Sequence, residues 1–280
     1  MIDKTKTPIL ISTPRAGSHW VGQFLRVTYQ NMGVILPGSS ENFNTDNLPD
    51  HITFEQVIHY FEQTRNVLDM DICTITHAPH LSEVIRIPSR PRYETLFDWF
   101  KEFYDGYQIV LLRRRNVWNQ YISWLFHKSI VIAQHQAGNT FTKRDFELHP
   151  WHNIEGTQRE EILKSTMELL KPKFVHREQM FQKFLSDLRY MEEEVRNYYV
   201  NGPYNNLNVR DWWLEDLSNE KLKEWFYPED IRDDYVMNEK ITPFKLMAET
   251  YFKKDDLAKV RDRFMKVYND ELKHYGYLVD

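Results

Sequence analysis

Residues 9–20 of the chain are Ile9-Leu10-Ile11-Ser12-Thr13-Pro14-Arg15-Ala16-Gly17-Ser18-His19-Trp20. An apolar run, a turn with one glycine and then the apolar spacing of a helix predict a buried strand, a tight turn at Gly17 and a helix. The N–H groups of a helix's first turn have no partner inside the helix and carry the positive end of its dipole. The turn therefore predicts an anion site, to which Arg15 adds a fixed positive charge.

Strands and helices are predicted to alternate along the rest of the chain. The expected helices cover residues 18–32, 93–104, 117–126, 159–170 and 255–275, with an amphipathic helix between 181 and 195, and the expected strands cover 72–76, 108–112 and 173–176. This alternation predicts an α/β fold: a central parallel sheet flanked by helices, a P-loop-like binding loop, and a helical, aromatic C-terminal part that includes Trp212 and Trp213. The segment 128–156 lacks a period, so we expect an irregular insertion in a single domain of 280 residues.

Composition limits the classes of function. The formal net charge of −5 argues against a general nucleic-acid binder or a protein of anionic membranes. The chain has one cysteine, Cys73, and its N-terminus lacks an apolar run of signal-peptide length, so we expect a cytoplasmic protein. Its sequence also contains no apolar stretch near the roughly 20 residues that span a bilayer.

Charged side chains follow two more of the expected strands. His77 stands at the end of the strand over 72–76, and Arg113, Arg114 and Arg115 follow the strand over 108–112. In parallel α/β sheets, ligands bind at the edge where the strands have their carboxyl ends. A histidine, with an ordinary pKa of about 6.5, can accept a proton near neutral pH, so His77 is a candidate general base.

Three motifs, in this order, resemble the sulfotransferases that use 3′-phosphoadenosine 5′-phosphosulfate (PAPS). The P-K/R-S/T-G-T-x-W loop of that family is similar to residues 14–20, its K-T-H-L-P segment to residues 75–79, and its R-N-x-x-D-x-x-x-S segment to residues 115–123. Residues 174–180 and 275–277 are weaker likenesses, to the family's strand before Y-E-D-L and to its common ending.

The resemblance implies in-line transfer of a sulfuryl group from PAPS to a hydroxyl of a small molecule or glycan, without a metal, and with PAP as the second product. His77 would be the general base, and Arg15 would stabilise the departing oxygen. The residues implied to bind the donor are Arg15, Ala16, Gly17, Ser18, His19 and Trp20 at the phosphosulfate-binding loop and adenine, and Arg115 and Ser123 at the 3′-phosphate.

Two positions depart from the family pattern: His19 replaces a threonine or serine, and Asn119 stands where many members have aspartate. The family's R-K-G-x-x-G-D-W-K segment has no counterpart in the sequence, so the segment 128–156, the stretch around 201–203 or Arg210 is expected to close over the nucleotide.

Two other classes stay open. A small-molecule kinase of the P-loop type is disfavoured because the first loop lacks a Lys-Ser/Thr pair and the sequence shows no clear acidic magnesium ligand. A non-catalytic nucleotide-binding or scaffold protein is disfavoured because Arg15, His77, Arg115 and Ser123 are all present.

Overall fold

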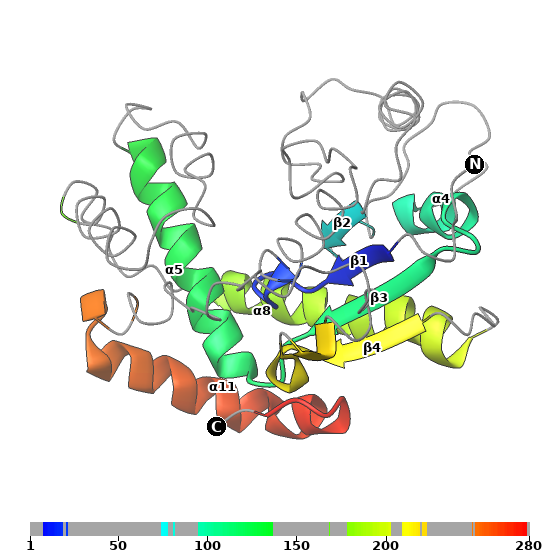
Figure 1. The fold of residues 1–280 in the computed structure, drawn as a ribbon. Helices are drawn as coiled ribbons and strands as arrows, with labels where there is room; N and C mark the ends of the chain where they lie inside the picture. Colours follow the sequence, from blue (N-terminus) through cyan, green and yellow to red (C-terminus); the bar gives the residue numbers. More distant parts are fainter. Residues whose placement is uncertain are drawn as a thin grey trace. The chain divides into compact units, whose positions relative to one another are not determined.

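Figure 1 shows the computed structural model of the chain. It describes residues 8–18, 21, 74–77, 81, 95–136, 168, 178–202, 209–218, 220–222, 248 and 250–278. The strands are β1 (Pro8–Ser12), β2 (Thr74–His77), β3 (Gln108–Arg113) and β4 (Val209–Trp213). The helices are α4 (Leu96–Phe103), α5 (Val117–Gln136), α8 (Glu178–Arg189), the π-helix η3 (Tyr190–Asn201), the 3₁₀ helix η4 (Leu214–Asp216) and α11 (Lys254–His274).

The four strands form one parallel sheet in the order β2-β1-β3-β4, and their arrows lie side by side in Figure 1. In this sheet Ser12 stands opposite His77 on one side and opposite Leu112 on the other. Parallel strands have their carboxyl ends at the same edge, so the turn after β1, His77 and the arginines after β3 all lie along that edge. The prediction of an α/β fold with a parallel sheet is confirmed.

Contacts divide the chain into two compact units, of which the first comprises Met1–Arg115 and Lys183–Met237. It contains the sheet, and alternate strand residues face one apolar cluster because side chains alternate between the faces of a strand. This cluster joins β1 and β3 to α4 and η3 through the buried residues Ile9, Ile11, Ile109, Leu111, Phe97, Phe100, Met191, Val195 and Tyr199. Thus α4 and η3 pack on one face of the sheet.

The second unit comprises Asn116–Gln182 and Asn238–Asp280. Aromatic rings hold it together: the ring centroid of Phe181 lies 4.9 Å from that of Tyr121 on α5 and 4.6 Å from that of Phe264 on α11. The buried residues of α11 recur every three or four positions, as expected for a helix with one apolar face: Leu257, Val260, Phe264, Tyr268 and Leu272. The single domain expected from the sequence stays a prediction.

The structure differs from the expected elements in three places. Helix α5 ends at Gln136 rather than near residue 126, so the first part of the supposed irregular insertion is helical. The β-branched residues there have weak helix propensity, but burial outweighs it, since Ile130 is buried. Trp212 and Trp213 belong to strand β4 and not to a helix, because they pair with β3. The amphipathic helix expected between 181 and 195 changes from α to π geometry at Tyr190.

Other expectations lie outside the described residues, among them the strand over 173–176 and most of the helices over 18–32 and 159–170. In the part of the chain that the structure does describe, no helix has the length and apolar character needed to cross a membrane.

Candidate functional site

The turn formed by residues 13–18 joins β1 to a helical segment at the carboxyl edge of the sheet. Its geometry is tight: the Ala16 N–H donates to the Thr13 carbonyl at 3.1 Å, and the Gly17 carbonyl accepts from the Val21 N–H at 3.2 Å. Arg15 has a φ of 63° and Gly17 a φ of 93°. A left-handed conformation costs a residue with a Cβ about 1–2 kcal/mol, and such strain clusters at ligand sites. Arg15 therefore marks this turn as a candidate site.

Gly17 lies against the side chain of Leu214, a residue far away in the sequence. A Cβ at this position would lie 2.6 Å from Cδ1 and 2.9 Å from Cδ2 of Leu214, in the η4 helix that follows β4. Real Cβ contacts are longer than this, so a Cβ at position 17 would force the side chain of Leu214, which is only 8% exposed, to shift. The group that approaches Gly17 in the structure is thus a packed side chain, and its backbone conformation independently favours glycine.

His77 is the last residue of β2, and its backbone pairs with Ser12 on the neighbouring strand β1. The candidate general base thus lies at the end of β2, next to the end of β1 where the 13–18 turn starts. Its side chain lies outside the described part of the structure, as do His19 and Trp20. Of the predicted loop residues, the structure describes Arg15, Ala16, Gly17 and Ser18; Ala16 and Ser18 are buried.

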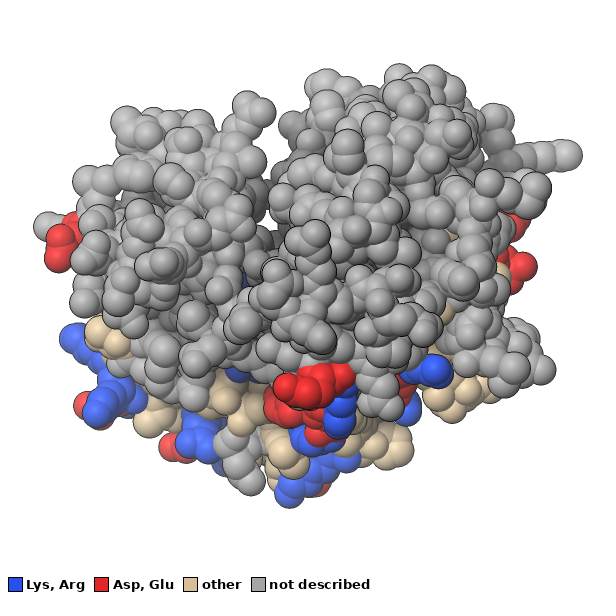
Figure 2. All heavy atoms as spheres, in the orientation of Figure 1, with Lys and Arg blue, Asp and Glu red and all other residues tan. Residues whose placement is uncertain are grey.

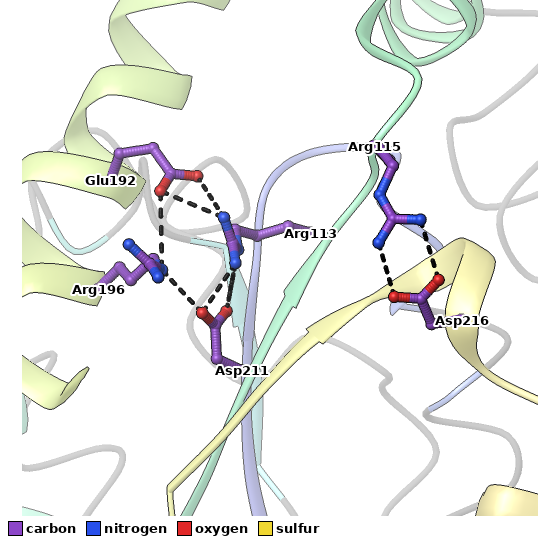
Figure 3. Close-up of polar contacts among 6 residues, drawn as sticks. All are labelled: Arg113, Arg115, Glu192, Arg196, Asp211 and Asp216. Carbon is purple, nitrogen blue, oxygen red and sulfur yellow. Dashed lines mark hydrogen bonds and ion pairs between the residues drawn. The ribbon is translucent and has the colours of Figure 1, made fainter. Parts of the chain in front are cut away.

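The three consecutive arginines after β3 have three different environments, of which Arg113 has the most enclosed. Its guanidinium donates to Asp211 from Nε at 2.9 Å and from Nη2 at 2.8 Å, and to Glu192 from Nη1 at 3.2 Å (Figure 3). Arg196 completes the cluster with a bond of 2.7 Å from Nε to Asp211. The carbon at the centre of the Arg113 guanidinium also lies 3.8 Å from the centre of the Trp213 ring. Two positive and two negative charges cancel, so Arg113 serves the packing of β3, β4 and η3.

Arg115 is also bonded to the protein itself. Its Nη1 and Nη2 atoms donate to the two carboxylate oxygens of Asp216 at 2.9 Å and 2.7 Å (Figure 3). Its backbone N–H donates to Oε2 of Glu215 at 2.8 Å. The bonds to Asp216 raise the pKa of the Arg115 guanidinium. The residue expected to bind a 3′-phosphate therefore holds a carboxylate in a two-bond fork, which is the arrangement that arginine also makes with phosphate.

Arg114 is the exception among the three. It is only 7% exposed, yet it makes no hydrogen bond or ion pair with any residue that the structure describes. Burial lowers the pKa of its guanidinium, and the negative charge of Glu215 opposes this shift.

Ser123, the other residue expected at the 3′-phosphate, is buried on α5 in the second unit, whereas Arg115 belongs to the first. A shared contact of the two with one phosphate stays a prediction. The helix that carries Ser123 begins as the sequence predicts, because the Asn116 side-chain oxygen accepts from the Asn119 N–H at 2.8 Å and caps it.

No protein-family model, curated protein or solved structure matches the chain.

The described surface carries charges of both signs, and the described residues contain no group of metal-ligand side chains. In Figure 2 the coloured Lys and Arg side chains are interspersed with Asp and Glu side chains on the face shown. Within the described ranges, no group of three or more His, Cys, Asp or Glu side chains could hold a metal ion.

The sequence does not indicate that Leu214 packs against Gly17, that Asp216 pairs with Arg115 or that Arg114 is buried. The contacts of Arg115 with η4 join residues 100 and 101 positions apart, and no local pattern announces them. The available signal was the acidic pair Glu215-Asp216, which follows the aromatic pair Trp212-Trp213 after Leu214 and could have been matched to the three arginines by charge.

Proposed function

We propose that this protein is a PAPS-dependent sulfotransferase that transfers a sulfuryl group to a hydroxyl of a small molecule or glycan. The observation that carries the proposal is the position of the 13–18 turn and His77. The turn follows β1, His77 ends the adjacent parallel strand β2, and the two strand ends are in register at Ser12. The order and elements agree with the motifs that suggested the family.

In this proposal each residue has one task. Backbone N–H groups of the 13–18 turn and its helix bind the phosphosulfate end of the donor, and Trp20 stacks on the adenine. The acceptor's oxygen attacks sulfur as His77 takes the hydroxyl proton, and the bond from sulfur to the bridging oxygen breaks. Arg15 stabilises the negative charge that develops on that oxygen. The positive φ of Arg15 supports a functional role for this turn, because backbone strain of this kind clusters at active sites and ligand clamps.

The 3′-phosphate is assigned to Arg115 and Ser123. The bond of Arg115 to Asp216 is compatible with this role, because the pair is partly exposed, with 31% and 48% of the two side chains accessible. Exposed ion pairs stabilise proteins little, so a dianionic phosphate can displace the carboxylate at small cost.

A transfer assay tests the proposal. Purified protein is incubated with PAPS labelled at sulfur and a panel of phenolic, steroid and sugar hydroxyl acceptors, and labelled product is separated from the donor. The protein should transfer label to at least one acceptor class without added magnesium. His77→Ala should lose about 100-fold or more in rate, since general base catalysis contributes on this scale. His274→Ala, in an exposed residue at the end of α11, is the matched control and should be fully active.

Two results would contradict the proposal. One is an absence of transfer to every acceptor by protein that is folded and saturated with donor. The other is transfer at an unchanged rate by His77→Ala, which would leave the reaction class standing but remove the assigned base.

A further inference from the structure

We infer that Arg114, together with Ser12, forms an oxyanion site for a phosphate or sulfate group beside the 13–18 turn. The part of the inference that concerns a nucleotide rests on the proposed function. It adds a charged residue, Arg114, at the phosphosulfate end of the donor. Neither residue was assigned to the site from the sequence.

The first observation is the burial of a charge that has no ion-pair partner among the described residues. Arg114 is 7% exposed, and a guanidinium keeps its proton at any physiological pH, so burial cannot be relieved by neutralisation. Burying an ion without a partner costs several kcal/mol. Its neighbours on either side are paired, Arg113 with Asp211 and Glu192, and Arg115 with Asp216.

The acidic residue that acts on Arg114 is Glu215. One oxygen of that carboxylate already accepts from the Arg115 N–H at 2.8 Å, and no ion pair joins Glu215 to Arg114 among the described residues. A bound anion would place a negative charge in direct contact with the Arg114 guanidinium, whereas the charge of Glu215 acts on it without an ion pair.

The second observation concerns a different strand. The Ser12 side chain is fully buried, and its Oγ has no hydrogen-bond partner among the described residues. A buried hydroxyl without a partner carries a cost, and a ligand that accepts its hydrogen bond would remove that cost.

The two residues stand at neighbouring strand ends. Ser12 is the last residue of β1 and pairs with Leu112 of β3, and Arg114 directly follows Arg113, the last residue of β3. The Arg113 side chain is directed to Glu192 on η3. The 13–18 turn starts directly after Ser12. An arginine, a hydroxyl and a strained turn are thereby brought to one part of the carboxyl edge.

A tetrahedral oxyanion suits this set of donors better than a carboxylate does. A guanidinium binds two oxygens in a fork, and a third oxygen remains for the serine hydroxyl. The anion can come from a nucleotide or from free inorganic phosphate or sulfate, and the experiment separates these sources.

The first arm measures thermal unfolding of the full chain with a few millimolar inorganic phosphate against chloride at equal ionic strength. Phosphate should raise the unfolding midpoint of the natural protein and of Arg261→Met, a control in an exposed arginine on α11. Arg114→Met should lose this response and should unfold no earlier than the natural protein in chloride, because it removes an unpaired buried charge. Arg114→Lys keeps the charge but not the fork, so it should retain part of the response.

The second arm measures the affinity for adenosine 3′,5′-bisphosphate (PAP) by calorimetry. Arg114→Met should bind it about 10- to 100-fold more weakly, the loss expected for charge-assisted hydrogen bonds, and Ser12→Ala should bind it several-fold more weakly. The two failures are distinguishable. If PAP binds equally to the natural protein and to Arg114→Met, the inference is wrong and the proposed function survives. If PAP does not bind but phosphate stabilises the protein through Arg114, the oxyanion site stands and the proposed function is wrong.

Discussion

Replacing Gly17 by alanine tests how the candidate site is built. Two costs add: the residue must keep a φ of 93°, and its Cβ would lie 2.6 Å and 2.9 Å from the two terminal methyl carbons of Leu214. The left-handed backbone costs about 1–2 kcal/mol for a residue with a Cβ. Overpacking costs about 1–3 kcal/mol, because Leu214 is only 8% exposed and has little space into which to move. We therefore expect Gly17→Ala to lose about 2–5 kcal/mol of folding free energy.

A second variant separates the two costs. Leu214→Ala removes the methyl groups that the new Cβ would meet, and by itself costs about 2–5 kcal/mol through the cavity that it leaves. In this background Gly17→Ala should cost only the backbone strain, about 1–2 kcal/mol. The coupling between the two positions should therefore be about 1–3 kcal/mol.

Urea unfolding at equilibrium, followed by the fluorescence of the chain's eight tryptophans, measures all four proteins of this cycle. A cost of Gly17→Ala below about 0.5 kcal/mol would exclude both the backbone strain and the overpacking, because each alone should cost more than this. An equal cost in the two backgrounds would refute the packing part alone and leave glycine as a requirement of the turn.

Three other predictions concern the ion pairs. Arg113→Met removes the closer guanidinium from the buried Glu192 and leaves Arg196 at 3.9 Å from it, so the variant should cost up to about 3–5 kcal/mol in urea unfolding; a loss below about 1 kcal/mol would contradict the structural role. Burial raises the pKa of Asp98, but its bonds to the side chain of Lys101 and to the cap of α4 outweigh burial and lower the pKa. The folded pKa thus lies below the unfolded one, so the advantage of the natural protein over Asp98→Asn at pH 7, about 0.3–1.5 kcal/mol for a capping-box residue, should fade as the pH falls below about 4, and an advantage that persists at pH 2 would oppose this. Asp216→Asn frees the fork of Arg115 and should tighten PAP binding by up to about five-fold in calorimetry; weaker binding would exclude Asp216 as a competitor of phosphate.

The elements of the fold could be predicted where the signal is local. The apolar runs at β1 and β3 identify buried strands, Asn116 identifies a helix start, and the recurrence of apolar residues identifies α11. Strand β4 was missed because its residues alternate only weakly between apolar and polar, and it becomes a strand by pairing with β3 across some 100 positions of sequence. Tertiary pairing of this kind outweighs local propensity.

In the candidate site, too, the features with a local sequence signal could be predicted and those that depend on distant residues could not. The turn and the strand-end position of His77 follow from short motifs, so they were predicted with their elements. The partners of Arg113, Arg114 and Arg115 could not be predicted, since consecutive residues at a strand end project to different faces and meet segments far away in the sequence. Arg113 therefore serves packing, Arg114 is buried with no ion-pair partner in the described part of the chain, and Arg115 forms a partly exposed ion pair. The sequence alone does not distinguish these three arginines.

Calorimetric titration of the natural protein with PAP, with AMP and magnesium ATP as controls, tests whether the chain has a binding site for the sulfuryl donor. We expect tight, metal-independent binding of PAP and a strong preference for the ligand that carries a 3′-phosphate. Failure to bind PAP, or a preference for magnesium ATP, would contradict a sulfotransferase donor site and favour a kinase or a scaffold instead.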